Sequence, residues 1–260
     1  MALREPAVAG MFYSAGERQL RQDVQALLGA AEPGPARTPK AMIVPHAGYI
    51  YSGPVAACGY RLLEPARTSV RRVILLGPAH RVYVEGMAIP ATEGFRTPLG
   101  TVPLDSTALE RISGLPGVCV SDAAHAQEHS LEVQLPFLQM ALEEFELVPI
   151  VVGQALPDDV GRVIDSLWGG PETLIVISSD LSHYLSYAEA RQVDGKTNQR
   201  ICDKASTLTG EEACGANAIN GLMRAKQVRE LQVETIDLRN SGDTAGDRTQ
   251  VVGYGTFVLH

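Results

Sequence analysis

Three histidines and one aspartate stand directly after apolar segments of the length of β-strands. His46 and His80 each follow such a segment, and Asp180 and His183 follow a third. In open α/β sheets, ligand sites form just beyond the carboxyl ends of the strands. A single histidine after a strand is more often a structural residue, but three of them beside a carboxylate favour a ligand or metal site. The sequence therefore predicts that these side chains meet at one edge of a sheet.

A second polar segment carries His125, Glu128 and His129. His125 and His129 are four residues apart, so a continuous helix would place both imidazoles on one face. The internal order His-Ala-Gln-Glu-His differs from the H-E-x-x-H motif of zinc proteases. We instead expect a helix to begin near Glu128, with Glu128 or His129 reaching into the site. His125 is explained equally well as a residue of a surface capping region.

Cys214 is the cysteine best placed for chemistry, because it stands at the start of a helix that we expect over residues 215–226. The N–H groups and the dipole of a helix start lower the pKa of a thiol and favour the thiolate, which binds metals and acts as a nucleophile. The alternative is a small buried apolar residue, which is our interpretation of Cys58, Cys119 and Cys202. The absence of C-x-x-C spacing favours reduced thiols in a cytosol.

The elements that would position these residues alternate between strands and helices. Segments rich in Val and Ile without alternation are typical of strands that are covered on both faces. We expect strands at 41–44, 72–76, 87–90, 118–120, 147–152, 174–177 and 251–259. We expect helices near 15–29, 53–63, 105–112, 130–144, 158–168, 186–207 and 215–226. The pattern predicts a single-domain α/β sandwich over residues 1–260, with a central mixed, largely parallel sheet that is flanked by helices.

Local signals refine some of these elements. Ser14 and Glu17 have the spacing of a capping box for the first helix. In the helix near 130–144, leucines spaced at three or four residues form one apolar face, and Pro136 should kink the helix. The segments 29–40 and 240–248 are rich in Gly, Pro and polar residues, so we expect loops there.

Composition excludes several classes of protein. The 260 residues include 22 basic and 30 acidic side chains, for a net charge of −8, whereas nucleic-acid binding requires a basic surface. The N-terminus lacks the apolar segment of a secretory signal. The longest uncharged stretch, 41–60, contains too many Pro, Gly and polar residues for a membrane helix. Nucleotide-binding glycine motifs and the G-x-S-x-G elbow are absent. We therefore expect a cytoplasmic protein without nucleic-acid or membrane partners.

Six short strings of this chain resemble those of the Memo family, which in prokaryotes is called AmmeMemoRadiSam system protein B. Each string alone is common, but the six together, in order and at matching positions, are specific. The resemblance extends from the first dozen residues to the closing segment 251–257. The strings are Pro6-Ala-Val-Ala-Gly-Met-Phe-Tyr13, Val44-Pro-His-Ala-Gly-Tyr49, Gly77-Pro-Ala-His80, Glu128-His-Ser-Leu-Glu132, Ser178-Ser-Asp-Leu-Ser-His-Tyr184 and Ala213-Cys-Gly215.

The resemblance implies a fold similar to that of the class III extradiol dioxygenases, which are non-haem iron enzymes. It also implies a metal position formed by two histidines and a cysteine, which match His46, His80 and Cys214. Asp180 and His183 match further pocket residues. His183 takes the place of the acid/base histidine of the dioxygenases, and we expect it to act near the unperturbed histidine pKa of about 6.5.

One ligand departs from the dioxygenase pattern of two histidines and one carboxylate, because Cys214 replaces the carboxylate. A thiolate shifts the metal preference toward copper(I) or zinc, and iron(II) also remains compatible. We therefore expect a bound metal ion, with iron or copper favoured and zinc possible. Dioxygenase activity does not follow from the fold alone. His129 joins Asp180 and His183 as a candidate catalytic residue, since it falls in the remaining polar pocket segment.

Two functions from different classes follow from these residues and from the resemblance. The first is a metal-dependent redox enzyme. The second is a non-catalytic protein that binds a metal, a small molecule or a peptide in the pocket and works with AMMECR1-like and radical-SAM proteins, which the resemblance implies as partners. A zinc hydrolase that uses the same ligands and an open water position ranks third, because the resemblance supplies no hydrolytic precedent.

Overall fold

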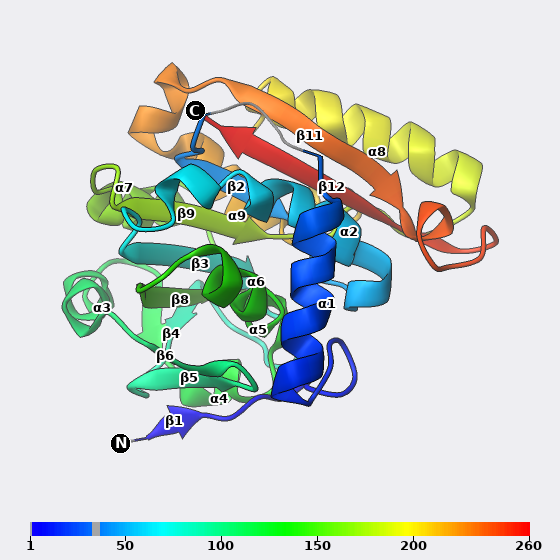
Figure 1. Ribbon diagram of the computed structural model, residues 1–260. Coiled ribbons are helices and arrows are strands. Elements are labelled where there is room, and N and C mark those ends of the chain that lie inside the picture. The colour runs from blue at the N-terminus through cyan, green and yellow to red at the C-terminus, as the bar shows by residue number, and fades with distance from the viewer. Residues whose placement is uncertain (1, 33–36) are drawn as a thin grey trace.

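A mixed β-sheet forms the centre of the computed structural model, which describes residues 2–32 and 37–260 (Figure 1). The strand order is β10-β12-β2-β9-β3-β8-β4-β7, and β11 pairs with β12. Parallel pairs join the four central strands, which are β2 (Ala41–Val44), β9 (Thr173–Ser178), β3 (Arg72–Pro78) and β8 (Glu146–Val152). The predicted mixed α/β architecture is therefore confirmed, with parallel pairing concentrated in the centre.

The flanks of the sheet introduce antiparallel pairs. β12 (Val251–Leu259) runs antiparallel to β2, and it also pairs antiparallel with β11 (Val233–Asn240) and β10 (His183–Leu185). On the other flank, β4 (Met87–Ile89) is antiparallel to β8 and parallel to β7 (Val118–Val120). A separate small sheet contains β1 (Leu3–Arg4), β5 (Gly94–Thr97) and β6 (Gly100–Pro103).

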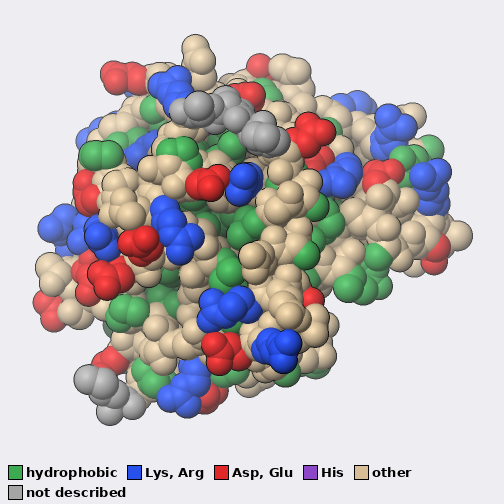
Figure 2. Space-filling model, viewed as in Figure 1, with side chains coloured by type: hydrophobic (Ala, Val, Ile, Leu, Met, Phe, Trp, Pro, Cys, Tyr) green, Lys and Arg blue, Asp and Glu red, His purple; other side chains and the backbone are tan. Residues whose placement is uncertain are grey.

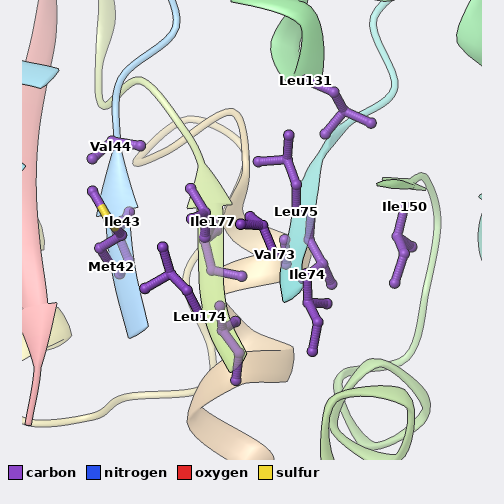
Figure 3. Close-up of a cluster of buried hydrophobic side chains, with 14 of the residues drawn as sticks. Met42, Ile43, Val44, Val73, Ile74, Leu75, Leu131, Ile150, Leu174 and Ile177 are labelled. Atoms are coloured by element: carbon purple, nitrogen blue, oxygen red, sulfur yellow. The ribbon is translucent and has the colours of Figure 1, made fainter. Parts of the chain in front are cut away.

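The core lies on both faces of the central strands. Every residue of β2 and β9 is buried, as expected for parallel strands that helices cover on both sides. Figure 3 shows Ile43 of β2, Ile177 of β9 and Leu75 of β3 on neighbouring strands, with Leu131 near the upper end of β3. Ile43 pairs with Ile177, and Leu75 pairs with Val176 next to it. This rigid core fixes the positions of the loops that follow the carboxyl ends of β2, β9 and β3.

Helices cover the two faces of the sheet (Figure 1). The contacts between elements divide most of the helices into two layers. The first layer contains α1 (Glu17–Ala30), α2 (Tyr49–Arg61), α5 (His129–Glu132) and α6 (Leu135–Ala141). The second contains α7 (Pro157–Leu167), α8 (Tyr187–Cys202) and α9 (Ala216–Arg224). The remaining elements of the described residues are α3 (Ser106–Ser113), α4 (Asp122–Ala126) and 3₁₀ turns at Glu64–Ala66, Lys226–Glu230 and Ser241–Asp243.

Two local predictions about helices are wrong in detail. Gly16, not Ser14, caps α1, and the Ser14 hydroxyl instead donates to Asp23 Oδ2 at 2.5 Å. The expected helix over 130–144 divides into α5 and α6, and Pro136 lies in the first turn of α6, where its missing N–H and fixed φ are tolerated. The leucines of the expected apolar face are all buried, and they are Leu131, Leu135, Leu138 and Leu142.

The expected loops need smaller corrections. Residues 29 and 30 belong to α1, and residues 33–36 of the expected loop lie outside the described residues. Residues 240–248 connect β11 to β12 and begin with the last residue of β11, followed by a 3₁₀ turn. Sequence patterns did not reveal β1, β5, β6, β10 or β11, because these strands are short or carry charged residues in place of an apolar alternation.

The surface carries charged side chains of both signs with apolar side chains between them, as the face in Figure 2 shows. Across the residues that the structure describes, no helix has the length and apolar character required to cross a membrane.

Candidate metal centre

Three adjacent parallel strands deliver polar side chains to one edge of the sheet. His46 lies two residues beyond the end of β2, Asp180 two residues beyond β9, and His80 two residues beyond β3. Because β9 pairs with both β2 and β3, Asp180 comes from the strand between those that carry the two histidines. The main-chain N–H of His46 donates to Asp180 Oδ1 at 2.8 Å. The structure thus brings these three residues together at the carboxyl edge.

Helix α5 brings a third imidazole to the same place. Glu128 is the N-cap of α5 and His129 is its first residue, as the sequence pattern indicated. The helix packs closely on β3 at Gly77, where a Cβ would lie 2.9 Å from both Leu131 Cδ2 and Ser130 Oγ. Only glycine therefore allows this approach without displacement of α5.

The three imidazoles form a compact cluster. His80 stacks on His129 with ring centroids 4.6 Å apart, and His46 meets both rings edge-on at 5.2 and 5.5 Å. One ring nitrogen from each of the three lies within 4.8 Å of the others. This spacing means that modest side-chain adjustments would let all three imidazoles reach a single ion.

Hydrogen bonds determine which nitrogen of His46 faces the cluster. The Ser178 hydroxyl donates to the Ser130 carbonyl at 2.6 Å. It accepts from Gln134 Nε2 at 2.7 Å, and the orientation of that amide is fixed because Nε2 also donates to the Pro45 carbonyl. Ser178 has one hydroxyl proton, so it can only accept at its 2.9 Å contact with His46 Nδ1. His46 therefore carries its proton on Nδ1, and its Nε2 lone pair faces the cluster.

Glu128 orients the ring of His80 in a similar way. Its Nδ1 lies 2.9 Å from Glu128 Oε1, and its main-chain N–H donates to Oε2 at 2.6 Å. Burial alone would raise the pKa of Glu128, but the hydrogen bonds from His80 and Ser130 lower it to about 2. The ionised carboxylate only accepts hydrogen bonds. His80 Nδ1 is consequently the donor, which leaves Nε2 free to bind a ligand.

His183 lies at the rim of the site. Like those of His46 and His80, its Nδ1 takes part in a hydrogen bond. It belongs to β10, and its Nδ1 donates to the Leu181 carbonyl at 2.8 Å. Burial lowers the pKa of His183, although the bond to Leu181 opposes the shift, and nearby His80 lowers it further. The expectation of an unperturbed pKa was therefore wrong, because the site desolvates this ring. At neutral pH the ring offers an unprotonated Nε2 and can accept a proton.

Cys214 contacts the cluster through His46, with Sγ 3.4 Å from His46 Nε2. It precedes Gly215, the N-cap of α9, and its sulfur accepts the N–H of Asp180 at 3.2 Å. Burial and the neighbouring Asp180 raise the pKa of this thiol, while the Gly215 N–H contributes a smaller opposite effect. The expectation of a thiol pKa lowered by the helix start was wrong, because desolvation outweighs the helix terminus here.

Burial favours the neutral form of His46 and His129. Burial lowers the pKa of His46 well below its usual value, and the neighbouring His80 and His129 add to this effect. Burial and His80 likewise lower the pKa of His129 to about 4. Asp180 shifts the other way, since burial raises its pKa to about 7 against the N–H groups of His46 and Ala47. The neutral imidazole is the form that binds metals.

His125 lies outside the cluster. Its Nε2 donates to the Ala88 carbonyl at 3.0 Å, and its ring packs edge-on against Phe95 at 5.7 Å. It is 2% exposed, so it is a core residue of the region between α4 and β4. It does not belong to the surface capping region that we considered.

Among the described residues, the donor atoms that all lie within 4.8 Å of one another belong to His46, His80 and His129, and Cys214 is not part of this group. The spacing between His46 and Cys214 nevertheless suits a transition-metal ion. Ligand atoms at about 2.1 Å (nitrogen) and 2.3 Å (sulfur) from one tetrahedral ion are about 3.6 Å apart, close to the 3.4 Å between His46 Nε2 and Cys214 Sγ. The Nδ1 atom of His129 is buried and has no hydrogen-bond partner among the described residues, although Glu128 Oε1 lies 3.5 Å away. A buried nitrogen without a partner is costly and would be satisfied by a ligand.

Sequence patterns did not indicate the residues that hold these candidate ligands in place. Ser178 and Gln134 are common polar residues inside apolar segments, and only the tertiary structure shows that they meet His46. Phe12, whose ring packs 4.8 Å from His129, appeared only as part of a family string. Their roles depend on long-range contacts that periodicity cannot encode.

The fold and this edge define an α/β protein with a histidine-rich cluster that could hold a metal ion. A sequence model of the family described as Memo-like protein matches residues 4–258. The chain belongs to this family. It is 38% identical over 270 residues to a MEMO1 family protein of Aquifex aeolicus, with 98% of each chain covered. It is 34% identical over 281 residues to a MEMO1 family protein of Thermotoga petrophila, with 98% of this chain and 99% of the relative covered.

A solved structure shares the fold at low sequence identity. An uncharacterised protein of Escherichia coli K12 superposes with a TM-score of 0.50 and 11% identity, covering 85% of this chain and 99% of the other. At this identity the likeness concerns the architecture alone.

Proposed function

We propose that this Memo-family protein is a metal-dependent redox enzyme whose ion is held by His46, His80 and Cys214, with iron or copper as the metal. The observation that carries the proposal is the similar hydrogen bonding of two imidazoles at this edge. Nδ1 of His46 and Nδ1 of His80 each donate to a protein oxygen, so Nε2 is the nitrogen that either ring can offer to an ion, and His46 Nε2 lies 3.4 Å from Cys214 Sγ. Such outer hydrogen bonds are the usual support of metal-binding histidines.

The ligand set favours a soft transition metal over a hard cation. Imidazole and thiolate donors suit copper, iron and zinc, whereas magnesium and calcium require oxygen donors. Iron or copper bound here would supply one-electron redox chemistry, while zinc would supply Lewis-acid chemistry alone. His129 stands close enough to serve as an additional or alternative ligand.

The surrounding residues of this chain then have distinct tasks. His183, with its Nδ1 bonded to Leu181, is the candidate proton acceptor because its Nε2 is free. Asp180 is buried beside the cluster and orients the main chain of His46. The ring of Phe12 covers one side of His129, which restricts the access of water to the imidazoles.

The test begins with metal content. Protein purified anaerobically would be analysed by mass spectrometry, together with His46→Ala and Cys214→Ser variants and with His260→Asn as a control histidine far along the chain. We expect near-stoichiometric iron or copper in the wild type and in the control, and less than a tenth of it in the two site variants. Metal-dependent oxygen consumption, measured with added ascorbate as the electron donor, should follow the same pattern. Wild-type protein that takes up neither iron nor copper would contradict the proposal.

A second candidate function is a binding protein that works with AMMECR1-like and radical-SAM proteins, and one observation favours it. Large apolar side chains flank the segments that carry the site. Tyr83, three residues after His80, is 78% exposed, and Tyr184, next to His183, is 70% exposed. Tyrosine is among the residues enriched at protein interfaces, so each of these side chains could contact a partner. A partner that docks over the mouth of the site would cover them.

Calorimetric titration would separate the two candidates. A binding function predicts that a purified AMMECR1-like protein from the same source binds the wild type, and that Tyr83→Ser with Tyr184→Ser weakens the complex at least tenfold. It also predicts no oxygen consumption above that of free metal. Measurable turnover by the isolated chain would instead favour the enzyme.

A further inference from the structure

A groove of about 1140 Å³ lies beside the histidine cluster, and none of the cluster histidines is among the described residues that line it. Helix α2 forms its floor through Ile50, Tyr51 and Pro54, while α1 and β11 provide the two walls. α2 packs against both α1 and β11, so the groove separates these walls. Phe12 lies at the groove and also against His129. The groove is therefore a separate concave surface that adjoins the metal centre.

The groove exposes apolar surface that a monomeric protein usually covers. Ile50 is 68% exposed and Met11, which also lines the groove, is 72% exposed. The α1 wall contributes Ala26 and Ala30, whose small side chains let another chain approach the helix closely. A concave apolar surface with such access is typical of an interaction site.

Strand β11 borders the groove with its open edge. Within residues 2–32 and 37–260, β11 pairs with β12 alone. Four consecutive residues, 234–237, line the groove. The register with β12 shifts between Thr235 and Asp237, so the side chains of this run do not alternate regularly and consecutive residues reach the groove. An extended polypeptide could therefore align with β11 and share main-chain hydrogen bonds with it, as in recognition by strand addition.

The charge of the groove is negative. Asp23, Glu32, Glu234 and Asp237 line it, and Arg239 is the one cationic side chain among its described lining residues. Arg239 forms an ion pair with Asp237, so it does not offset the other carboxylates. A concave site with fixed charges of one sign concentrates ligands of the opposite sign. The complementary ligand thus combines cationic groups with apolar ones.

We propose that this groove binds an extended segment of a partner polypeptide in which apolar residues alternate with Lys or Arg. The apolar side chains contact Ile50 and Tyr51, the cationic side chains reach Glu32 and Glu234, and the main chain follows β11. The volume exceeds the roughly 300–1,000 Å³ of small-molecule pockets, which favours a polypeptide over a metabolite. The proposal requires no metal and stands independently of the redox function.

Two labelled decapeptides of equal length test the proposal on the full chain. One alternates Leu with Lys and the other alternates Leu with Glu, and fluorescence anisotropy measures their binding at physiological salt. We expect the Lys peptide to bind at least tenfold more tightly than the Glu peptide, and Ile50→Ser to weaken it several-fold without a change in metal content. Equal affinity for the two peptides would overturn the proposal, as would undetectable binding of the Lys peptide.

A charge-reversal pair separates the groove from general attraction by an acidic protein. Glu32→Lys with Glu234→Lys changes the groove, and Glu110→Lys with Glu230→Lys changes the net charge equally outside it. We expect the groove pair to reduce affinity for the Lys peptide at least tenfold, and the control pair to change it less than twofold. Equal losses in the two pairs would show that the long-range field, not the groove, binds the peptide.

Discussion

His46 and His125 are buried to the same extent, each 2% exposed, yet their rings are bonded in opposite ways. His46 donates from Nδ1 to Ser178 and presents Nε2 to the thiol of Cys214. His125 donates from Nε2 to Ala88, and its Nδ1 has no partner among the described residues. Equal burial therefore does not distinguish the two histidines. The direction in which the unprotonated ring nitrogen points does distinguish them.

The charges around the two rings differ as well. The ring of His46 faces two other imidazoles and a thiol, and the main-chain N–H of His46 donates to the carboxyl of Asp180. Near His125, the guanidinium of Arg4 donates to the His125 carbonyl and forms a buried ion pair with Glu132. A fixed guanidinium disfavours a second cation nearby. One histidine lies in a place suited to a metal ion, and the other in a place that only a neutral side chain fits.

The largest effect should come from truncating each ring in turn. His46→Ala removes a ligand and should abolish metal binding, whereas His125→Ala leaves a cavity in the core and should cost about 3 kcal/mol of unfolding free energy with metal content unchanged. Mass spectrometry and chemical denaturation measure the two quantities. If His125→Ala lost its metal at temperatures where the protein stays folded, His125 would not be a purely structural residue.

The pH dependence of the unfolding free energy tests the role of His125 in this comparison. Burial lowers the pKa of His125 to about 4, although its bond to Ala88 opposes the shift. The folded-state pKa lies below the unfolded value of about 6.5, so the unfolded chain binds the proton first as the pH falls. The stabilisation is present above pH 6.5 and is lost progressively toward pH 4, by up to about 3 kcal/mol.

The matched variant for this series is His125→Gln, whose amide can still donate to Ala88. The histidines of the metal centre contribute equally to the wild type and the variant, so the difference between the two metal-free proteins isolates His125. Denaturation between pH 7 and 4 should show a slope for the variant that is shallower by up to about 1.4 kcal/mol per pH unit. Identical slopes would show that His125 does not titrate on unfolding in this range.

Ser178→Ala tests the hydrogen bond that fixes His46. The change removes the acceptor of His46 Nδ1 and of Gln134 Nε2, and loss of such outer contacts typically costs 10–100-fold in metal affinity. Ser178→Thr retains the hydroxyl and should restore most of it. ¹⁵N shifts of the His46 ring in metal-free protein should show one tautomer in the wild type and a mixture in the Ala variant. A single unchanged tautomer in Ser178→Ala would contradict the assignment.

The contrast also shows what sequence can reveal. The positions of His46, His80 and Asp180 could be predicted because each follows an apolar run, and parallel strands end at a common edge. The tautomer of His46 could not, since it depends on Ser178 and Gln134, which are distant in sequence. For Cys214 the helix terminus suggested a thiolate, but burial beside Asp180 has the larger effect on its pKa. Local patterns locate candidate ligands, and the tertiary structure sets the chemistry of their side chains.

Strand β11 illustrates the same limit for the fold. Its sequence places Glu234, Asp237 and Arg239 among apolar residues without a regular alternation, and the register with β12 shifts between Thr235 and Asp237. A bulge of this kind interrupts the period of two that identifies strands. β11 is nevertheless a strand, because it pairs with β12, which is apolar and buried. Tertiary context thus overrides a weak local pattern in a peripheral strand, while the buried central strands are evident from their composition.

Gly77→Ala gives the smallest expected change in metal binding and tests whether the histidine cluster depends on the close contact between α5 and β3. The added methyl group would lie 2.9 Å from Leu131 and Ser130, so α5 must move by a fraction of an ångström. Because Ser130 accepts from Ser178, that movement should loosen the bond to His46 and weaken metal binding several-fold, with a loss of about 1–3 kcal/mol in stability. Gly114→Ala is the control, since its methyl group would meet no atom within 4 Å. Unchanged metal affinity in Gly77→Ala, despite a measurable loss of stability, would show that the tautomer of His46 tolerates movement of α5 and that β9 and Gln134 are sufficient to hold it.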